Sequence, residues 1–196
     1  MRLSKHSKNL IVRLINKGLW TTFQWRLTLA YRIWGINAIH KYLLLCDPSY
    51  VGRILTKFGA TLGADYDLYS PLLIHNAEED YSNLKVGEHC HIGREVFLDL
   101  GASILIENYV TISMRVMILT HMDVGKSPLK NKEFPTHKSP IVIKKGAYIG
   151  AGAIILQGVT IGECAVVGAG ALVSRDIPAN TVAVGIPARV VRQLGN

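Results

Sequence analysis

The chain has 196 residues, of which 49% are hydrophobic and 18% are charged, a composition that excludes an intrinsically disordered protein. Its formal net charge of +8 indicates either a solvated basic surface or an anionic partner, which could be a ligand, a membrane surface or nucleic acid. The sequence has no zinc-finger spacing, no RNP-type aromatic motif and no long Lys/Arg run, which argues against nucleic acid as the partner. The three cysteines, Cys46, Cys90 and Cys164, are widely spaced, which argues against both a disulfide framework and a zinc site.

Residues 1–60 are expected to form an N-terminal helical region, ahead of a second region that spans residues 61–196. Between residues 5 and 46, aromatic and aliphatic side chains recur every three or four positions, with no turn-forming break before Asp47-Pro48. This spacing predicts one face of an amphipathic helix. The face consists of Trp20, Phe23, Leu27, Tyr31 and Trp34. Such a basic helix serves either as a cap on the following region or as a peripheral contact with an anionic membrane.

No segment has the apolar core of a secretory signal peptide or the length of a transmembrane helix, because Arg, Lys or His interrupts each apolar stretch. The sequence therefore predicts a cytoplasmic protein. It is expected at the inner face of the membrane if its helical region binds lipid.

From residue 62 onward the sequence repeats with a period of six, most clearly between residues 143 and 176. One column of the repeat is aliphatic: Ile143, Ile149, Ile155, Ile161, Val167 and Val173. A second column, four positions further on, is mostly small: Ala147, Ala153, Val159, Ala165 and Ala171. An earlier block, residues 86–118, keeps the same pattern apart from a two-residue insertion around residues 100–103.

A six-residue period fits neither an α-helix nor an alternating strand. It predicts a parallel β-solenoid in which each short strand forms one side of a three-sided prism. The aliphatic column points inward, the small column fills the narrow interior, and the small residue after each aliphatic position is expected to let the chain turn the corner. Because each coil is stabilised by its neighbours, the ends need caps.

The periodicity is interrupted between residues 120 and 140, a stretch with three prolines and several charges. We expect an excursion loop there, and long loops inside a compact domain are usually functional. His121 stands where the first block meets this loop, with Asp123 close by in sequence. His121 and Asp123 are therefore the catalytic candidates. Imidazole has an ordinary pKa of about 6.5, so His121 is a candidate general base, a role that typically contributes about 10²–10⁴ in rate.

The repeat in residues 62–176 resembles the hexapeptide-repeat acyltransferases, and within them the galactoside and maltose acetyltransferases and the capsule or exopolysaccharide O-acetyltransferases. The segments that carry this resemblance are VFLDL at 96–100, VMILTHMD at 116–123 and AYIGAGAIILQGVTIGECAVVGAGALVSRDIPANTVAVGIPARVVRQ at 147–193. The resemblance implies a left-handed β-helix and a homotrimer. It also implies direct acetyl transfer from acetyl-CoA, without a metal, to a sugar or glycan. The first sixty residues do not match the acceptor-binding segment of galactoside acetyltransferases, so no particular sugar is implied.

The resemblance also assigns roles to individual residues. His121 corresponds to the family's catalytic histidine and Asp99 to a ligand of the acceptor hydroxyl. The residues expected to bind CoA are Ala151, Ala169, Ser174, Arg175, Arg189 and Arg192. Small residues admit the pantetheine arm, and cations suit the phosphates. In a trimer, His121 of one chain is expected to act on CoA held by Ala151 and Ala169 of another.

Three alternatives are open from the sequence. An acyltransferase supplied by acyl carrier protein shares the repeat, although the IPARVVR tail favours CoA. A γ-class carbonic anhydrase shares the solenoid, but it needs three histidines around a metal, and no close third histidine accompanies His121 and His137. A non-catalytic solenoid is the third alternative, against which the Thr-His-x-Asp segment argues.

Overall fold

The computed structural model describes residues 5–131 and 133–195, with side chains from Trp20 onward apart from Asn131. Residues 1–4 of the expected helical region lie outside the described residues. The chain forms two compact units, residues 1–39 and residues 40–196. The last helix ends at Lys57 and the first strand begins at Thr61, whereas the second compact unit begins earlier, at His40.

The first unit contains helix α1 (Lys5–Trp34) and the start of α2 (Ile36–Leu45). Although the sequence has no turn-rich break before Asp47, Gly35 adopts a φ of +68° and separates α1 from α2. Leu27 is buried, whereas Trp34 is 68% exposed, so the expected apolar face is not buried along its whole length. No described helix is long and apolar enough to cross a membrane.

Helix α3 (Pro48–Lys57) caps the first coil of the solenoid within the second unit. Asp47 begins it as N-cap, accepting a hydrogen bond from the Ser49 backbone N–H at 2.9 Å. Its buried face contains Val51, Ile54 and Leu55, and the helix contacts strands β1 and β2. This helix covers the end of the first coil, which would otherwise be exposed to solvent.

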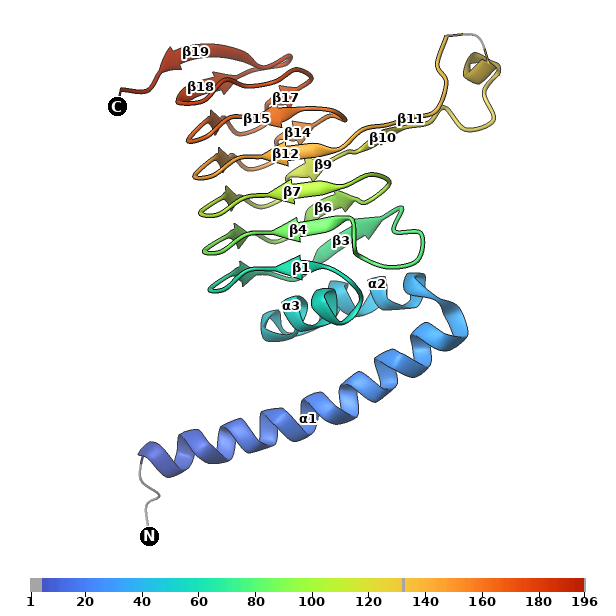
Figure 1. Ribbon diagram of the computed structural model, residues 1–196, viewed down its shortest axis with the longest axis vertical. Helices are drawn as coiled ribbons and strands as arrows, with labels where there is room; N and C mark the ends of the chain where they lie inside the picture. Colours follow the sequence, from blue (N-terminus) through green and yellow to red (C-terminus); the bar gives the residue numbers. More distant parts are fainter. Residues whose placement is uncertain (1–4, 132, 196) are drawn as a thin grey trace. The chain divides into compact units, whose positions relative to one another are not determined.

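The solenoid has three parallel sheets, one for each side of the prism (Figure 1). Sheet A contains β1 (Thr61–Leu62), β4 (Leu84–Val86), β7 (Ile104–Ile106), β12 (Ile141–Ile143) and β15 (Thr160–Ile161). Sheet B contains β2 (Asp67–Leu68), β5 (His91–Ile92), β8 (Thr111–Ile112), β13 (Tyr148–Ile149), β16 (Val166–Val167), β18 (Thr181–Val184) and the antiparallel β19 (Arg189–Gln193). Sheet C contains β3 (Leu72–His75), β6 (Val96–Asp99), β9 (Met117–Ile118), β14 (Ile154–Ile155) and β17 (Leu172–Val173).

Both predicted columns face the interior of the prism. Ile143 of β12 pairs with Ile106 of β7 and Ile161 of β15, and all three are fully buried. The small column is buried as well, and it leaves room for the aliphatic column in the narrow interior. The solenoid prediction is therefore confirmed in its register as well as in its class.

The reason for the small residue beside each aliphatic position differs from the expected one. A Cβ added at Gly150 would lie 2.5 Å from the backbone nitrogen of Ala169 in the next coil. The corner itself is turned two residues later, where Gly152 has a φ of +69°. The small residue is thus required by the close approach of the next coil, while the turn depends on a left-handed residue further on.

Sheet C has two edges of different character. We call the turns from sheet B into sheet C the B–C edge; they include residues 113–116, 150–153 and 168–171. We call the connections from sheet C into sheet A the C–A edge. The C–A edge includes the excursion loop, in which β10 (His121–Met122) pairs with β11 (His137–Lys138) and a short 3-10 helix, η1, spans Pro128–Asn131. This hairpin projects from the solenoid (Figure 1).

Candidate active site

The C–A edge brings together a histidine and a carboxylate that are far apart in sequence. Because β6 and β9 pair in register, Asp99, the last residue of β6, meets His121, which begins β10 just after β9, at this edge. The Nδ1 atom of His121 lies 2.5 Å from Oδ2 of Asp99. The Asp99 side chain is fully buried, whereas 26% of the His121 side chain is exposed. The ring is therefore anchored on one side and accessible on the other.

Asp99 is buried as a charged group because hydrogen bonds surround it. Its Oδ2 accepts from the backbone N–H groups of Thr120 and His121, at 2.8 and 3.0 Å. Its Oδ1 accepts from Gly101 N–H and from the Asn76 side-chain amide at 2.9 Å. Burial raises the pKa of Asp99, but the hydrogen bonds from His121, Asn76 and Gly101 and the neighbouring His121 charge outweigh it and leave this pKa below its usual range.

This arrangement determines which nitrogen of His121 can act as a base. An ionised carboxylate only accepts hydrogen bonds, so Nδ1 carries the proton that faces Asp99. Nε2 is then left with a lone pair. A carboxylate in this position also stabilises the imidazolium that forms once Nε2 takes up a proton. A ring held in this way can accept a proton at Nε2 from a group that approaches its exposed side.

Sequence reasoning missed two further residues of the site, Asn76 and His75. Nδ2 of Asn76 lies 3.1 Å from Nδ1 and 3.2 Å from Nε2 of His121, and Asn76 holds a left-handed φ of +53°. His75 pairs with Asp99 across β3 and β6, and its ring centroid lies 6.3 Å from that of His121. Both residues lie ahead of the two regular blocks of the repeat, residues 86–118 and 143–176, where the sequence carried no signal beyond residue type.

Asp123, the second catalytic candidate, lies in the excursion loop. Its carboxylate accepts hydrogen bonds within the excursion loop, from Gly125 N–H at 2.8 Å and from Nζ of Lys130 at 3.1 Å. The carboxylate that contacts His121 is Asp99 instead. Asp99, expected to bind the acceptor, is fully buried and already engaged by its neighbours, which suits it to orienting the histidine rather than to touching substrate.

The residues expected to bind CoA are divided between the two edges of sheet C within one chain. Ala151 and Ala169 lie on the B–C edge, whereas Ser174 and Arg175 follow β17 on the C–A edge. Arg189 and Arg192 lie on the terminal strand β19 and are exposed. On the B–C edge, a Cβ added at Gly152 or Gly170 would meet nothing within 4 Å, so this edge is open to a ligand. One chain alone does not assemble these residues around His121.

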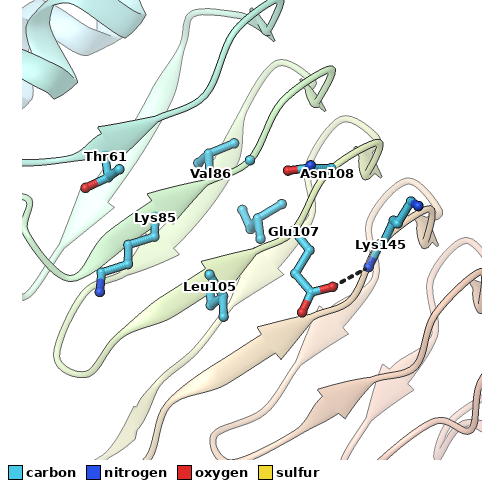
Figure 2. A pocket seen from close by; sticks show the side chains of 9 residues that line it. Thr61, Lys85, Val86, Leu105, Glu107, Asn108 and Lys145 are labelled. Atoms are coloured by element: carbon cyan, nitrogen blue, oxygen red, sulfur yellow. Dashed lines mark hydrogen bonds between the residues drawn. The ribbon is translucent and has the colours of Figure 1, made fainter.

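A concave surface lies on sheet A, apart from His121. It is a groove of about 410 Å³, and its floor includes Leu105 between Lys85 and Glu107 (Figure 2). Glu107 accepts a hydrogen bond from the backbone N–H of Lys145 at 2.9 Å. None of the predicted site residues lines this groove. Among the described residues, no three His, Cys, Asp or Glu side chains are grouped so that they could hold a metal ion.

Comparisons with known proteins identify relatives of both the repeat and the fold. Residues 140–175 match the family model "bacterial transferase hexapeptide (six repeats)". The chain is 30% identical over 155 residues to a galactoside O-acetyltransferase of Lactococcus lactis, covering 76% of this chain and 70% of that protein. It is 36% identical over 115 residues to the galactoside O-acetyltransferase of Escherichia coli, where the match spans 56% of this chain and only 57% of the relative.

Solved structures resemble the chain over most of its length. A hexapeptide-repeat-containing acetyltransferase of Vibrio cholerae superposes with a TM-score of 0.72 at 27% identity, covering 82% of this chain and 89% of that one. A galactoside acetyltransferase in complex with coenzyme A superposes with a TM-score of 0.69 at 26% identity, covering 81% and 78%.

Proposed function

Because the chain belongs to the hexapeptide-repeat acetyltransferases and shares their left-handed β-helix, we propose that it transfers an acetyl group from acetyl-CoA to a hydroxyl group of a sugar or glycan. Amine acceptors are the second choice. The observation that carries the proposal is the buried Asp99 paired with the partly exposed His121 at the C–A edge. The galactoside O-acetyltransferase relatives support a sugar as the acceptor. The structural neighbours bound to acetyl-CoA or coenzyme A support acetyl-CoA as the donor.

The proposed reaction is direct transfer in a ternary complex. Nε2 of His121 accepts the proton of the acceptor hydroxyl while that oxygen attacks the thioester carbonyl. The tetrahedral intermediate collapses by breaking the carbon–sulfur bond, and the imidazolium returns the proton to the departing CoA thiolate. Asp99 keeps Nδ1 protonated and stabilises the charged ring between the two steps.

The cysteines offer a poorer route through a covalent acyl-enzyme. Cys90 is buried, and this burial raises the pKa of its thiol. Cys164 lies at a turn between sheets A and B, away from the C–A edge that holds His121. A nucleophilic cysteine requires an accessible thiolate beside a base. Direct transfer therefore agrees better with the geometry.

The outer face of sheet C favours a trimer. Every strand of this sheet has one large apolar outward residue, and these paired residues form one continuous column: Leu73, Phe97, Met117, Ile154 and Leu172. The matching columns on the other two sheets include Lys85 on sheet A and Asp67 on sheet B. Burying apolar surface contributes about 25 cal/mol per Å², so the face of sheet C is the favoured contact between copies.

Such packing also completes the site. Threefold packing of one face around an axis places one edge of that face beside the opposite edge of the next copy. The C–A edge of one chain, with His121, Ser174 and Arg175, would then face the B–C edge of the next, with Ala151 and Ala169. The cleft between them would enclose a pantetheine arm that neither edge encloses alone.

We propose a cytoplasmic location, where acetyl-CoA is available. The experiment that tests the function is release of free thiol from acetyl-CoA in the presence of simple sugars, nucleotide sugars and lipid-linked glycans, with mass spectrometry of the acceptor. Acetylated product that disappears in His121→Ala supports the proposal. Transfer from acyl carrier protein but not from CoA would favour the first alternative, and a folded trimer without product from any acceptor class would contradict acetyl transfer.

A further inference from the structure

The positive charge of this chain is concentrated ahead of its first acidic residue, Asp47. Residues 1–46 contain eight Lys and Arg residues and no Asp or Glu. The remaining 14 Lys and Arg residues are matched by all 14 Asp and Glu residues. The whole net charge of +8 therefore resides in residues 1–46, while residues 47–196 are neutral overall. A segregated charge of this kind attracts an anionic partner to one part of the molecule.

Helix α1 also exposes an apolar strip. Trp25, Leu29 and Ile33 are 74%, 60% and 57% exposed, and their spacing of four places them on one side of the helix. At about 100° per residue, the exposed Arg26 and Arg32 lie on either side of this strip, each about 60° from Leu29. We call these five residues the α1 surface. Exposed apolar side chains grouped in this way mark an interaction surface.

We propose that the α1 surface docks onto a bilayer that contains anionic lipid. Trp25, Leu29 and Ile33 enter the boundary between headgroups and acyl chains, and the two arginines contact lipid phosphates. Charge favours lipid over a second copy of the chain, because pairing two α1 surfaces would bring together two basic segments that contain no acidic residue. The docking does not depend on which reaction the solenoid catalyses.

The test is sedimentation of the full-length protein with phosphatidylcholine vesicles, with and without phosphatidylglycerol, at low and high salt and without acetyl-CoA. We expect binding only to the anionic vesicles and release at high salt, because screening weakens exposed charge contacts. The double variant Trp25→Ala/Leu29→Ala should bind at least about tenfold more weakly. Arg26→Lys/Arg32→Lys should bind nearly normally, and Arg26→Glu/Arg32→Glu should not bind.

A matched control is Leu105→Ala/Tyr109→Ala, which removes one exposed aliphatic and one exposed aromatic residue from the solenoid and should leave vesicle binding unchanged. Equal binding to neutral and anionic vesicles, or normal binding by a folded Trp25→Ala/Leu29→Ala variant, would overturn the proposal. So would a change in oligomeric mass in that variant without any change in vesicle binding, since the α1 surface would then be a contact between copies. Because binding is measured without turnover, a negative result leaves the proposed acetyl transfer intact.

Discussion

The two edges of sheet C are built by the same repeat, yet they differ in regularity. The B–C edge carries an unbroken ladder of backbone hydrogen bonds, with Arg115, Gly152 and Gly170 donating to the coil before. The C–A edge accommodates the excursion loop and holds the polar groups around His121. A regular edge provides an extended surface along which a long ligand can bind. An irregular edge on a rigid scaffold can instead position side chains for catalysis.

The largest difference between the two edges should appear when the proposed base, His121, is removed from the C–A edge. His121→Ala should lower kcat by about 10²-fold or more, because the acceptor proton then has no positioned base. Binding of CoA and the circular dichroism spectrum should stay the same, since the B–C edge is untouched. Near-normal turnover in the purified variant would show that chemistry does not depend on this edge.

Mixed trimers test whether the two edges of different chains form one site. His121→Ala chains and Ala151→Trp/Ala169→Trp chains should each be nearly inactive at limiting acetyl-CoA. After joint dissociation and reassembly, about a quarter of sites would combine an intact C–A edge with an intact B–C edge under random threefold assembly. Activity should rise accordingly. Confirmed mixed trimers without recovered activity would place each site within one chain.

A milder change in the C–A edge tests whether Asp99 orients His121 or binds the acceptor. Asp99→Asn keeps the size of the side chain but removes the charge that stabilises the imidazolium, so kcat should fall by about tenfold or more. The Michaelis constant for acetyl-CoA should change little. If Asp99 instead bound the acceptor, the Michaelis constant for the sugar would rise while kcat stayed near normal.

The lowered pKa of Asp99 also predicts how its contribution to the stability of the fold changes with pH. Its folded pKa lies below the usual value, which is about 3.9 in an unfolded chain. Its contribution to stability is therefore present above that pH and lost as the pH falls through the folded value. The difference in Tm between wild type and Asp99→Asn, measured by thermal unfolding, should be largest near neutral pH and shrink under acid conditions. A difference that does not depend on pH would contradict an ionised Asp99.

The smallest expected effect concerns the exposed cations of β19. Arg189→Ala/Arg192→Ala should raise the Michaelis constant for acetyl-CoA a few-fold, because exposed charge pairs contribute little each, and should flatten its dependence on salt. The constant for the acceptor should hardly change, and Arg189→Lys/Arg192→Lys serves as the matched control. Equal effects on both substrates would mean that β19 supports the assembly rather than CoA.

The fold could be predicted in detail because a solenoid depends on local repetition. Ile143, Ile149 and Ile155 lie six apart and each meets its equivalent in the next coil, so a one-dimensional pattern determines the three-dimensional register. The same logic located the excursion loop, since a loop is where the period fails. It also located His121, which stands at the boundary between the repeat and the excursion loop.

The partners of His121 could not be predicted in this way. Asp99 and Asn76 lie 22 and 45 residues before it, and Asp123 is closer in sequence but accepts hydrogen bonds from its own loop. Contacts across the C–A edge depend on how irregular connections of different length end beside one another. No period in the sequence encodes that.

The sequence by itself determined the three-sided solenoid, its loop and the position of the catalytic candidate, because all of these follow from which residues repeat and where the repeat stops. Only the tertiary structure decided which carboxylate orients the histidine, why a small residue stands at each coil contact, and that α1 exposes Trp25, Leu29 and Ile33 to solvent. These features depend on how chain segments that are distant in sequence approach one another, or leave a surface uncovered, and packing in three dimensions sets both.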